Sequence, residues 1–327
     1  MGLWLCPYTA AHSVVGAFRA EVMLSVKYRT GLASLRMAVS RRLLDFILRG
    51  RDAAALPQHV LLPDDEVSGE MLVAGMHEGQ LLQPLLDHFL TAHKPRFADE
   101  IALDVGANIG NHSLFFSRYF RTVLAVEPNP LTLHVLRANA ALSGADIRVL
   151  PMGFADQDGM LSFFSNKRGN LGASGFAFAG GPTGSADGLQ IECPVRRGDA
   201  VLGEVLSGER LSRIGLIKLD VEGAELSALR GLGETLQRDK PFVIFESLKS
   251  EGESGGAAIF SLLREVGYAT FYAVESSVTN ARSSAIGWLV RLFSGERVCL
   301  RRLELPAVGH AYLMILAVPA DRTLGAA

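Results

Sequence analysis

Cysteine is scarce in this chain, and its placement excludes two classes of protein. The 327 residues contain only three cysteines, Cys6, Cys193 and Cys299, which lie far apart and form neither a Cys-x-x-Cys pair nor a cluster with histidine. Such a set supplies neither a disulfide framework nor a zinc site of the usual kinds. The HxH and HExxH patterns of metal enzymes are also missing, so we expect no bound metal. A reducing compartment fits this cysteine usage best.

A large excess of charge of either sign is absent too. Lysine and arginine number 32 against 34 aspartates and glutamates, a formal net charge of -2. A dedicated nucleic-acid binder usually carries a strongly positive surface, so we expect no nucleic-acid partner. The longest uncharged apolar stretch, residues 1–18, is interrupted by Pro7, His12 and Ser13. We interpret it as neither a signal peptide nor a membrane-spanning helix, and we predict a cytoplasmic location.

The first 51 residues, in contrast, are distinctly basic. They carry eight lysines and arginines against only Glu21 and Asp45. Apolar residues recur there at the spacing of one helix face: Leu32, Leu35, Val39, Leu43 and Phe46. Such an amphipathic helix can place residues 19–51 on an anionic membrane surface. It can also pack on the main domain and leave a solvated basic rim, which is the commoner arrangement.

From about residue 60, short apolar runs alternate with helical segments, a pattern typical of a parallel sheet with helices on both faces. The expected strands are residues 101–105, 122–126, 147–150, 214–219 and 242–245, with a final buried strand at 311–318. We therefore predict the α/β class with a Rossmann-like, doubly wound and mostly parallel sheet. The expected organisation is a basic, helical N-terminal extension over 1–58 followed by one domain over 59–327.

A glycine-rich stretch near residues 165–190 separates the third and fourth expected strands. It contains seven glycines and is too long for an ordinary connection between a strand and a helix. We expect it to be a mobile lid or a disordered insertion.

The first expected strand runs into a glycine turn and then a helix. Gly106 and Gly110 let the backbone approach a ligand there, and the helix start offers free N–H groups. A dinucleotide loop needs glycines at its first, third and sixth places, but Asn108 and Asn111 occupy the last two. This spacing disfavours a nicotinamide dehydrogenase. An acidic residue two before the first glycine, Asp104, suits the methionine end of S-adenosylmethionine, and asparagine at 108 tolerates a left-handed backbone.

Two further carboxylates follow neighbouring strands. Glu127 ends the second expected strand at the same edge of the sheet, where an acid accepts hydrogen bonds from both hydroxyls of a ribose. Asp156 follows the third strand and is able to reach the adenine amine, although a carboxylate in a turn is nearly as ordinary an explanation. Asp104, Gly106, Asn108, Gly110, Glu127 and Asp156 are therefore the predicted cofactor-binding residues.

Lys218 and Asp220 lie two apart on the fourth expected strand and so face the same side of the sheet. Charges in a buried strand are costly unless they are paired or used, so these two form either a bracing ion pair or part of a catalytic site. Asp220 is our first candidate for the base that removes a proton from the acceptor, and Glu246 is the second. His112 follows the glycine turn, but capping or packing of the first helix is its more ordinary role.

These motifs resemble those of the FkbM-type methyltransferases, which are class I S-adenosylmethionine-dependent enzymes. The resemblance rests on Asp-Val-Gly-Ala-Asn-Ile-Gly at 104–110, Val-Glu-Pro-Asn-Pro at 126–130 with Asn139 following, Asn-Leu-Gly-Ala-Ser at 170–174, Ile-Lys-Leu-Asp-Val-Glu-Gly-Ala-Glu at 217–225, and Phe-Glu at 245–246. It implies a class I methyltransferase fold, S-adenosylmethionine as cofactor, and methylation of hydroxyl groups without a required metal.

The function we expect is S-adenosylmethionine-dependent O-methylation of a saccharide or other small-molecule acceptor. The amine-methylating signature Asn-Pro-Pro-aromatic is absent after the fourth strand, where Asp220-Val221 stands instead, so oxygen is the better acceptor. The alternative is a non-catalytic protein of the same fold that docks to a membrane or a partner through its basic extension. The presence of Asp104, Gly106 and Glu127 argues against lost cofactor binding.

Overall fold

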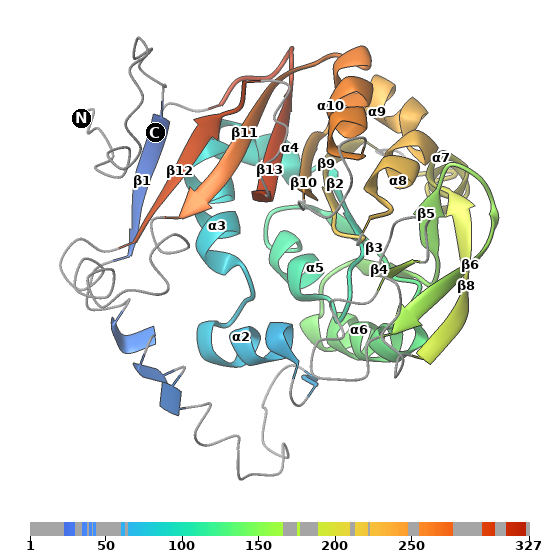
Figure 1. Ribbon diagram of the computed structural model, residues 1–327, viewed down its shortest axis with the longest axis horizontal. Coiled ribbons are helices and arrows are strands. Elements are labelled where there is room, and N and C mark those ends of the chain that lie inside the picture. The colour runs from blue at the N-terminus through green and yellow to red at the C-terminus, as the bar shows by residue number, and fades with distance from the viewer. Residues whose placement is uncertain are drawn as a thin grey trace.

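A nine-stranded sheet flanked by helices organises the computed structural model (Figure 1). The structure describes residues 23–29, 35–37, 39–40, 42–43, 60–62, 65–165, 175–176, 189–209, 213–221, 223–247, 255–276, 296–304 and 312–324. The strands follow one another across the sheet in the order β1 (Met23–Arg29), β12 (Glu296–Arg302), β11 (Tyr268–Ser276), β13 (Tyr312–Pro319), β10 (Phe242–Ser247), β9 (Ile214–Leu219), β2 (Ile101–Val105), β3 (Thr122–Val126) and β4 (Ile147–Leu150).

The direction of the strands confirms the predicted fold class. Neighbours from β10 to β4 pair in parallel, whereas successive pairs from β10 to β1 are antiparallel. The five parallel strands plus β11 and β1 therefore run one way, and β13 and β12 run the other. The chain winds outward from β2 through β3 and β4, then returns to the other side of β2 as β9. The carboxyl ends of β2 and β9 thus form the switch point at which ligands bind in doubly wound sheets.

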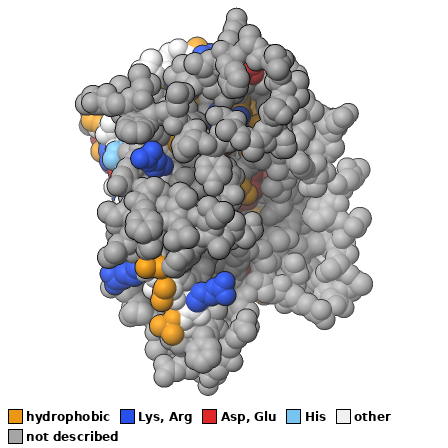
Figure 2. All heavy atoms as spheres, turned by 60° about the vertical axis from the view of Figure 1, so that its left-hand side comes forward, with side chains coloured by type: hydrophobic (Ala, Val, Ile, Leu, Met, Phe, Trp, Pro, Cys, Tyr) orange, Lys and Arg blue, Asp and Glu red, His pale blue; other side chains and the backbone are white. Residues whose placement is uncertain are grey.

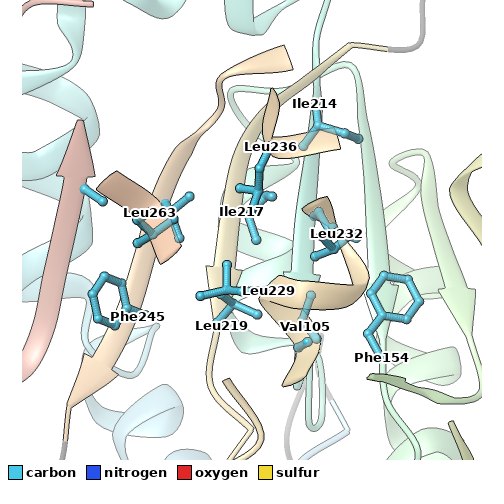
Figure 3. Packing of buried hydrophobic residues seen from close by; sticks show 14 of the residues in the cluster. Val105, Phe154, Ile214, Ile217, Leu219, Leu229, Leu232, Leu236, Phe245 and Leu263 are labelled. Carbon is cyan, nitrogen blue, oxygen red and sulfur yellow. The ribbon is translucent and has the colours of Figure 1, made fainter. Parts of the chain in front are cut away.

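Helices cover both faces of the sheet, which explains why its strands are continuous apolar runs. On one face, Val105, Leu219 and Phe245 pack against leucines of the covering helices (Figure 3). These helices are α7 (Gly198–Val205), α8 (Glu225–Gly231), α9 (Gly233–Asp239) and α10 (Gly255–Glu265). The two alternating sets of side chains on each strand therefore enter two separate cores.

The opposite face has its own core, in which Ala102, Leu216 and Ile244 contact Leu82 and Phe116. The elements on this side come mostly from the segment before β2. They are α2 (Glu66–Ala74), α3 (Gly79–Pro84), a π-helical turn η1 (Leu85–Phe89), a 3-10 turn η2 (Thr91–His93), α4 (Lys94–Phe97), α5 (Asn111–Phe116) and α6 (Pro130–Ser143).

A second, four-stranded sheet stands beside the main one and was not expected from the sequence. Its strands are ordered β5 (Gly153–Ala155), β8 (Leu189–Arg197), β6 (Gly159–Ser165) and β7 (Gly175–Phe176). β6 pairs antiparallel over its whole length with residues 189–195 of β8, so the glycine-rich stretch connects two arms of a hairpin. Residues 166–174 and 177–188 of that stretch lie outside the described residues, and so does the predicted lid.

The N-terminal extension is not helical throughout, and the predicted boundary at residue 58 is wrong for one element. β1 pairs antiparallel with β12 and is an edge strand of the main sheet. The physical signal was present in the sequence, because Leu24, Val26 and Tyr28 alternate with polar residues at the period of a strand. The period of two is therefore a better guide to the structure of this segment than its basic charge.

Part of the predicted amphipathic helix is present, at residues 35–37, 39–40 and 42–43. Two members of its apolar stripe, Val39 and Leu43, are 57% and 54% exposed. Arg36 and Arg42 are exposed as well. Figure 2 shows apolar side chains flanked by basic ones on this face of the molecule. Within the described residues, no helix combines the length and apolarity needed to cross a bilayer.

Asn139 of α6 ties the start of the described domain to the glycine loop. Its side chain is fully buried, and Nδ2 donates to the carbonyl oxygens of Ile109 at 2.8 Å and Val60 at 3.1 Å. Its Oδ1 accepts from the Val60 N–H at 2.7 Å. One amide side chain thus satisfies three backbone groups from segments that are far apart in sequence.

We expect Asn139→Ala to lower the free energy of unfolding by about 2–4 kcal/mol, because it leaves buried backbone groups without partners. Urea denaturation measures this loss. Arg137→Ala, on the exposed side of the same helix, is the matched control and should change stability by about 0.5 kcal/mol or less. Equal stability of the two variants would show that Asn139 does not hold the loop.

Candidate active site

Three loops meet where β2, β3 and β9 end. The N–H groups of Gly106 and Ala107 both donate to the Val126 carbonyl oxygen, at 2.9 and 3.0 Å. The Asp220 N–H donates to the Val105 carbonyl oxygen at 3.0 Å. The glycine turn, the end of β3 and the end of β9 are therefore joined by backbone hydrogen bonds at the switch point of the sheet.

The backbone of the glycine turn is left-handed at three residues whose types tolerate this conformation. Gly106, Asn108 and Gly110 have φ values of 83°, 52° and 94°, so asparagine at 108 does adopt the left-handed conformation. A Cβ on Gly106 would lie 1.8 Å from the Asp220 carbonyl oxygen, and one on Gly110 would lie 2.8 Å from Leu136 Cδ1. The sequence suggested that Gly106 makes room for a ligand, but its first role is to let the turn pack against the end of β9.

Glu127 bridges two backbone segments with its carboxylate. Oε2 accepts from the Asn108 N–H at 2.7 Å, and Oε1 accepts from the Asn129 N–H at 2.8 Å. Burial raises the pKa of Glu127 to about 7, although both backbone donors act in the opposite direction. Each carboxylate oxygen keeps a second lone pair, so each is able to accept a further hydrogen bond from a ribose hydroxyl.

Several buried polar atoms around the glycine turn lack hydrogen-bond partners among the described residues. Asp104 is fully buried; its Oδ2 accepts from Ser113 Oγ at 2.6 Å, whereas Oδ1 is unsatisfied. Asn108 Oδ1 and Asn129 Nδ2 are unsatisfied too. Buried polar atoms are nearly always paired in folded proteins, so this cluster indicates a polar ligand. These acceptors and donors fit the amino acid and ribose groups of S-adenosylmethionine.

The Lys218–Asp220 ion pair lies next to this cluster. Lys218 Nζ donates to Asp220 Oδ2 at 2.8 Å, and the side chains are 3% and 31% exposed. Burial disfavours the Lys218 ammonium, but the charges of Asp220, Asp104 and Glu78 raise its pKa above the ordinary value. Burial likewise opposes the charge of Asp220, yet Lys218 holds the pKa of Asp220 below its usual range. Asp220 is therefore an ionised carboxylate that a ligand is able to reach.

The remaining predicted residues, Asp156 and Glu246, come from other elements of the fold. Asp156 is exposed after β5, and its Oδ1 accepts from Ser227 Oγ of α8 at 2.8 Å. Glu246 is half-buried in β10, two residues beyond Ile244, the register partner of Lys218. Glu225 accepts from the Gly223 N–H at 3.0 Å, so it stabilises the start of α8.

Two histidine–glutamate pairs stand beside Lys218, and the sequence analysis did not identify them. His77 Nδ1 is 2.7 Å from Glu70 Oε2, and His112 Nε2 is 3.3 Å from Glu78 Oε2. No pattern in the sequence reveals a partner for His77. Its partner lies seven residues earlier, on the other side of a turn, and such a separation carries no specific signal.

Comparison with known proteins decides the family. The family model of the methyltransferase FkbM domain matches residues 104–270, which include the glycine turn, Glu127 and the Lys218–Asp220 pair. The chain belongs to the FkbM methyltransferases. The resemblance noted from the sequence is confirmed, and S-adenosylmethionine is the methyl donor of this enzyme.

Individual relatives of this FkbM methyltransferase are similar over part of its length. "Methyltransferase 1" of Beauveria bassiana is 30% identical over 196 residues, which cover 54% of this chain and 74% of that protein. The hexuronic acid methyltransferase AglP of Haloferax volcanii is 33% identical over 148 residues, which cover 45% of this chain and 56% of that protein. The crystal structure of an FkbM methyltransferase from Methylobacillus flagellatus aligns with a TM-score of 0.38 at 15% identity, covering 88% of this chain and 60% of that one.

The raised pKa of Glu127 predicts pH-dependent cofactor binding. Only the ionised carboxylate accepts from both ribose hydroxyls, and the ionised fraction falls about tenfold for each pH unit below 7. We expect the affinity for S-adenosylhomocysteine to rise up to about pH 7 and to level off above about pH 8. Isothermal titration calorimetry over this range measures the profile.

Variants separate this effect from a general influence of pH. Glu127→Ala should weaken binding by about 2–3 kcal/mol, and Glu127→Gln should bind weakly with no dependence on pH. Glu234→Gln, which changes an exposed carboxylate on α9, should keep the wild-type profile. An unchanged affinity of Glu127→Ala would exclude the ribose assignment.

Proposed function

We propose that this FkbM methyltransferase transfers the methyl group of S-adenosylmethionine to a hydroxyl group of a saccharide or other small-molecule acceptor. The observation that carries the proposal is the ionised, partly exposed Asp220 at the carboxyl edge of the sheet. A carboxylate acceptor suits a neutral hydroxyl donor. The absence of the amine-methylating signature at this position and the hexuronic acid methyltransferase among the relatives support the same chemistry.

Asp220 binds and orients the acceptor hydroxyl in this proposal. Lys218 keeps Asp220 ionised and holds its carboxylate in place, because the pair is joined at 2.8 Å. Holding the hydroxyl at a fixed angle to the donor methyl group supplies much of the rate acceleration that an enzyme obtains by positioning its reactants. Glu246 of the neighbouring strand is the second candidate for this role.

The test has two stages. S-adenosylhomocysteine should bind the wild-type protein in a calorimetric titration, and mass spectrometry should detect methyl transfer to members of a panel of neutral sugars, uronic acids and hydroxylated lactones. With an acceptor from the panel, Asp220→Asn should reduce single-turnover transfer by about 10² fold, the loss expected when a reacting group is misplaced, while cofactor affinity stays constant. Absence of cofactor binding would instead favour the non-catalytic alternative.

The competing explanation is that Asp220 only braces the sheet through Lys218. It predicts a lower melting temperature for Asp220→Asn with activity mostly retained. Asp146→Asn, which weakens one of the two surface ion pairs of Arg148, is the control for a general effect of losing an ion pair. A destabilised but active Asp220→Asn protein would transfer the role to Glu246.

We also propose that the described helical residues of the basic segment, 35–37, 39–40 and 42–43, contact an anionic membrane surface. If this helix packed on the main domain instead, its apolar stripe would be buried, but Val39 and Leu43 are exposed. Arg36 and Arg42 are exposed beside them, which adds attraction to anionic lipid headgroups. Cys193 is free and buried, so the compartment we propose is a reducing one such as the cytoplasm.

Co-sedimentation with vesicles tests the membrane contact. The protein should bind phosphatidylcholine vesicles that contain phosphatidylserine, bind pure phosphatidylcholine weakly, and dissociate as salt is added. The double variant Val39→Ser, Leu43→Ser should lose this binding. Leu142→Ser, which removes an exposed leucine from α6, should retain it. Equal binding of the two variants would contradict the proposal.

A further inference from the structure

His77 and Glu70 form a hydrogen-bonded pair that belongs to no role described above. Glu70 lies on α2 and His77 on the turn that follows, and His77 Nδ1 is 2.7 Å from Glu70 Oε2. The side chains are 25% and 11% exposed. The pair therefore leaves part of the imidazole ring accessible while the carboxylate that orients it is nearly covered.

The turn that carries His77 is held firmly against the glycine loop. The His77 N–H donates to Asn111 Oδ1 at 2.9 Å, and Asn111 Nδ2 donates to the His77 carbonyl oxygen at 3.2 Å. Asn111 directly follows Gly110, the last residue of the glycine turn. The next residue, Glu78, has a φ of 56° and starts α3. A left-handed glutamate is uncommon, and such conformations persist where surrounding contacts maintain them.

The charged groups that face His77 come from four elements. Burial disfavours the imidazolium, but the hydrogen bond with Glu70 and the charges of Glu78 and Glu70 raise the pKa of His77 above its ordinary value, against the effect of Lys218. His112 of α5 is also near, with ring centroids 6.4 Å apart. Burial and the charge of Lys218 hold the pKa of His112 below its usual range. The pKa values of the two histidines are therefore displaced in opposite directions.

We propose that His77, oriented by Glu70, accepts the proton of the acceptor hydroxyl. The inference rests on the proposed function. The hydroxyl proton moves to His77 Nε2 while its oxygen forms a bond to the donor methyl carbon, and the carbon–sulfur bond breaks with its electron pair remaining on sulfur. Glu70 accepts a hydrogen bond from Nδ1–H, which fixes the tautomer and stabilises the imidazolium that forms.

In this proposal, Asp220 orients the acceptor hydroxyl and His77 accepts its proton. Asp220 is paired with Lys218, and its lowered pKa makes it a weak proton acceptor. An imidazole titrates near the operating pH and is the better base. The two Asn111 hydrogen bonds hold the His77 turn beside the glycine turn, which packs against the Asp220 carbonyl group, so His77 and Asp220 belong to the same region of the site.

An experiment without the unknown acceptor tests whether His77 faces the transferable group. Sinefungin, an S-adenosylmethionine analogue that cannot transfer a methyl group, carries an amine where the methyl group stands. Its positive charge should expel a proton from His77, whereas S-adenosylhomocysteine has no charge there. Calorimetric titrations of the full chain in buffers of different ionisation enthalpy should show up to about half a proton more released with sinefungin, at a pH near the pKa of His77.

The variants decide the outcome. The extra proton release should disappear in His77→Gln, shift to lower pH in Glu70→Gln, and persist in His134→Gln, which alters an exposed histidine of α6. Glu70→Gln retains the imidazole and gives a second readout if His77→Gln does not fold. Equal proton release for the two ligands, or an unchanged difference in His77→Gln, overturns the proposal for His77. Failure of S-adenosylhomocysteine to bind at all would instead overturn the proposed function.

Discussion

A buried lysine is the constraint on which this site depends. Lys218 lies next to the last residue of the otherwise apolar strand β9 with its side chain 3% exposed, and an unpaired ammonium is strongly disfavoured there. Asp220 satisfies it directly, Asp104 is its register partner across β2 and β9, and Glu78 adds a third negative charge. The charge of one side chain therefore requires carboxylates from three segments to lie together.

That requirement links the cofactor side of the site to the acceptor side. Asp104 belongs to the strand before the glycine turn, and the backbone carbonyl oxygen of Asp220 lies against Gly106. Glu78 approaches from the opposite direction and brings the His77 turn with it. A shift of any one of these segments changes the electrostatic potential at the other two, because a buried charge is poorly screened in a medium of low dielectric constant. The buried charges thus hold the segments that carry Asp104, Asp220 and Glu78 in fixed positions relative to one another without covalent links between them.

The cofactor half could be predicted from the sequence because it is local. Gly106, Asn108 and Gly110 lie within five positions, and Glu127 follows the next strand, so strand periodicity is enough to place them together. The same logic found Lys218 and Asp220 on one strand. It failed at β1, where a period of two was present but the charge of the segment dominated the interpretation. The second sheet was missed because the residues between its strands obscured the hairpin that joins β6 and β8.

The acceptor half could not be predicted for a different reason. Glu70 and His77 lie on either side of a turn whose geometry depends on Asn111, more than thirty residues further along the chain. No local pattern encodes a hydrogen bond of that kind, since it exists only when α2 and α5 dock on the same face of the sheet. The left-handed backbone of Glu78 is likewise a consequence of tertiary contacts, because its residue type does not favour it. The family is therefore readable from short local motifs, whereas the proton acceptor that we propose depends on contacts that only the fold assembles.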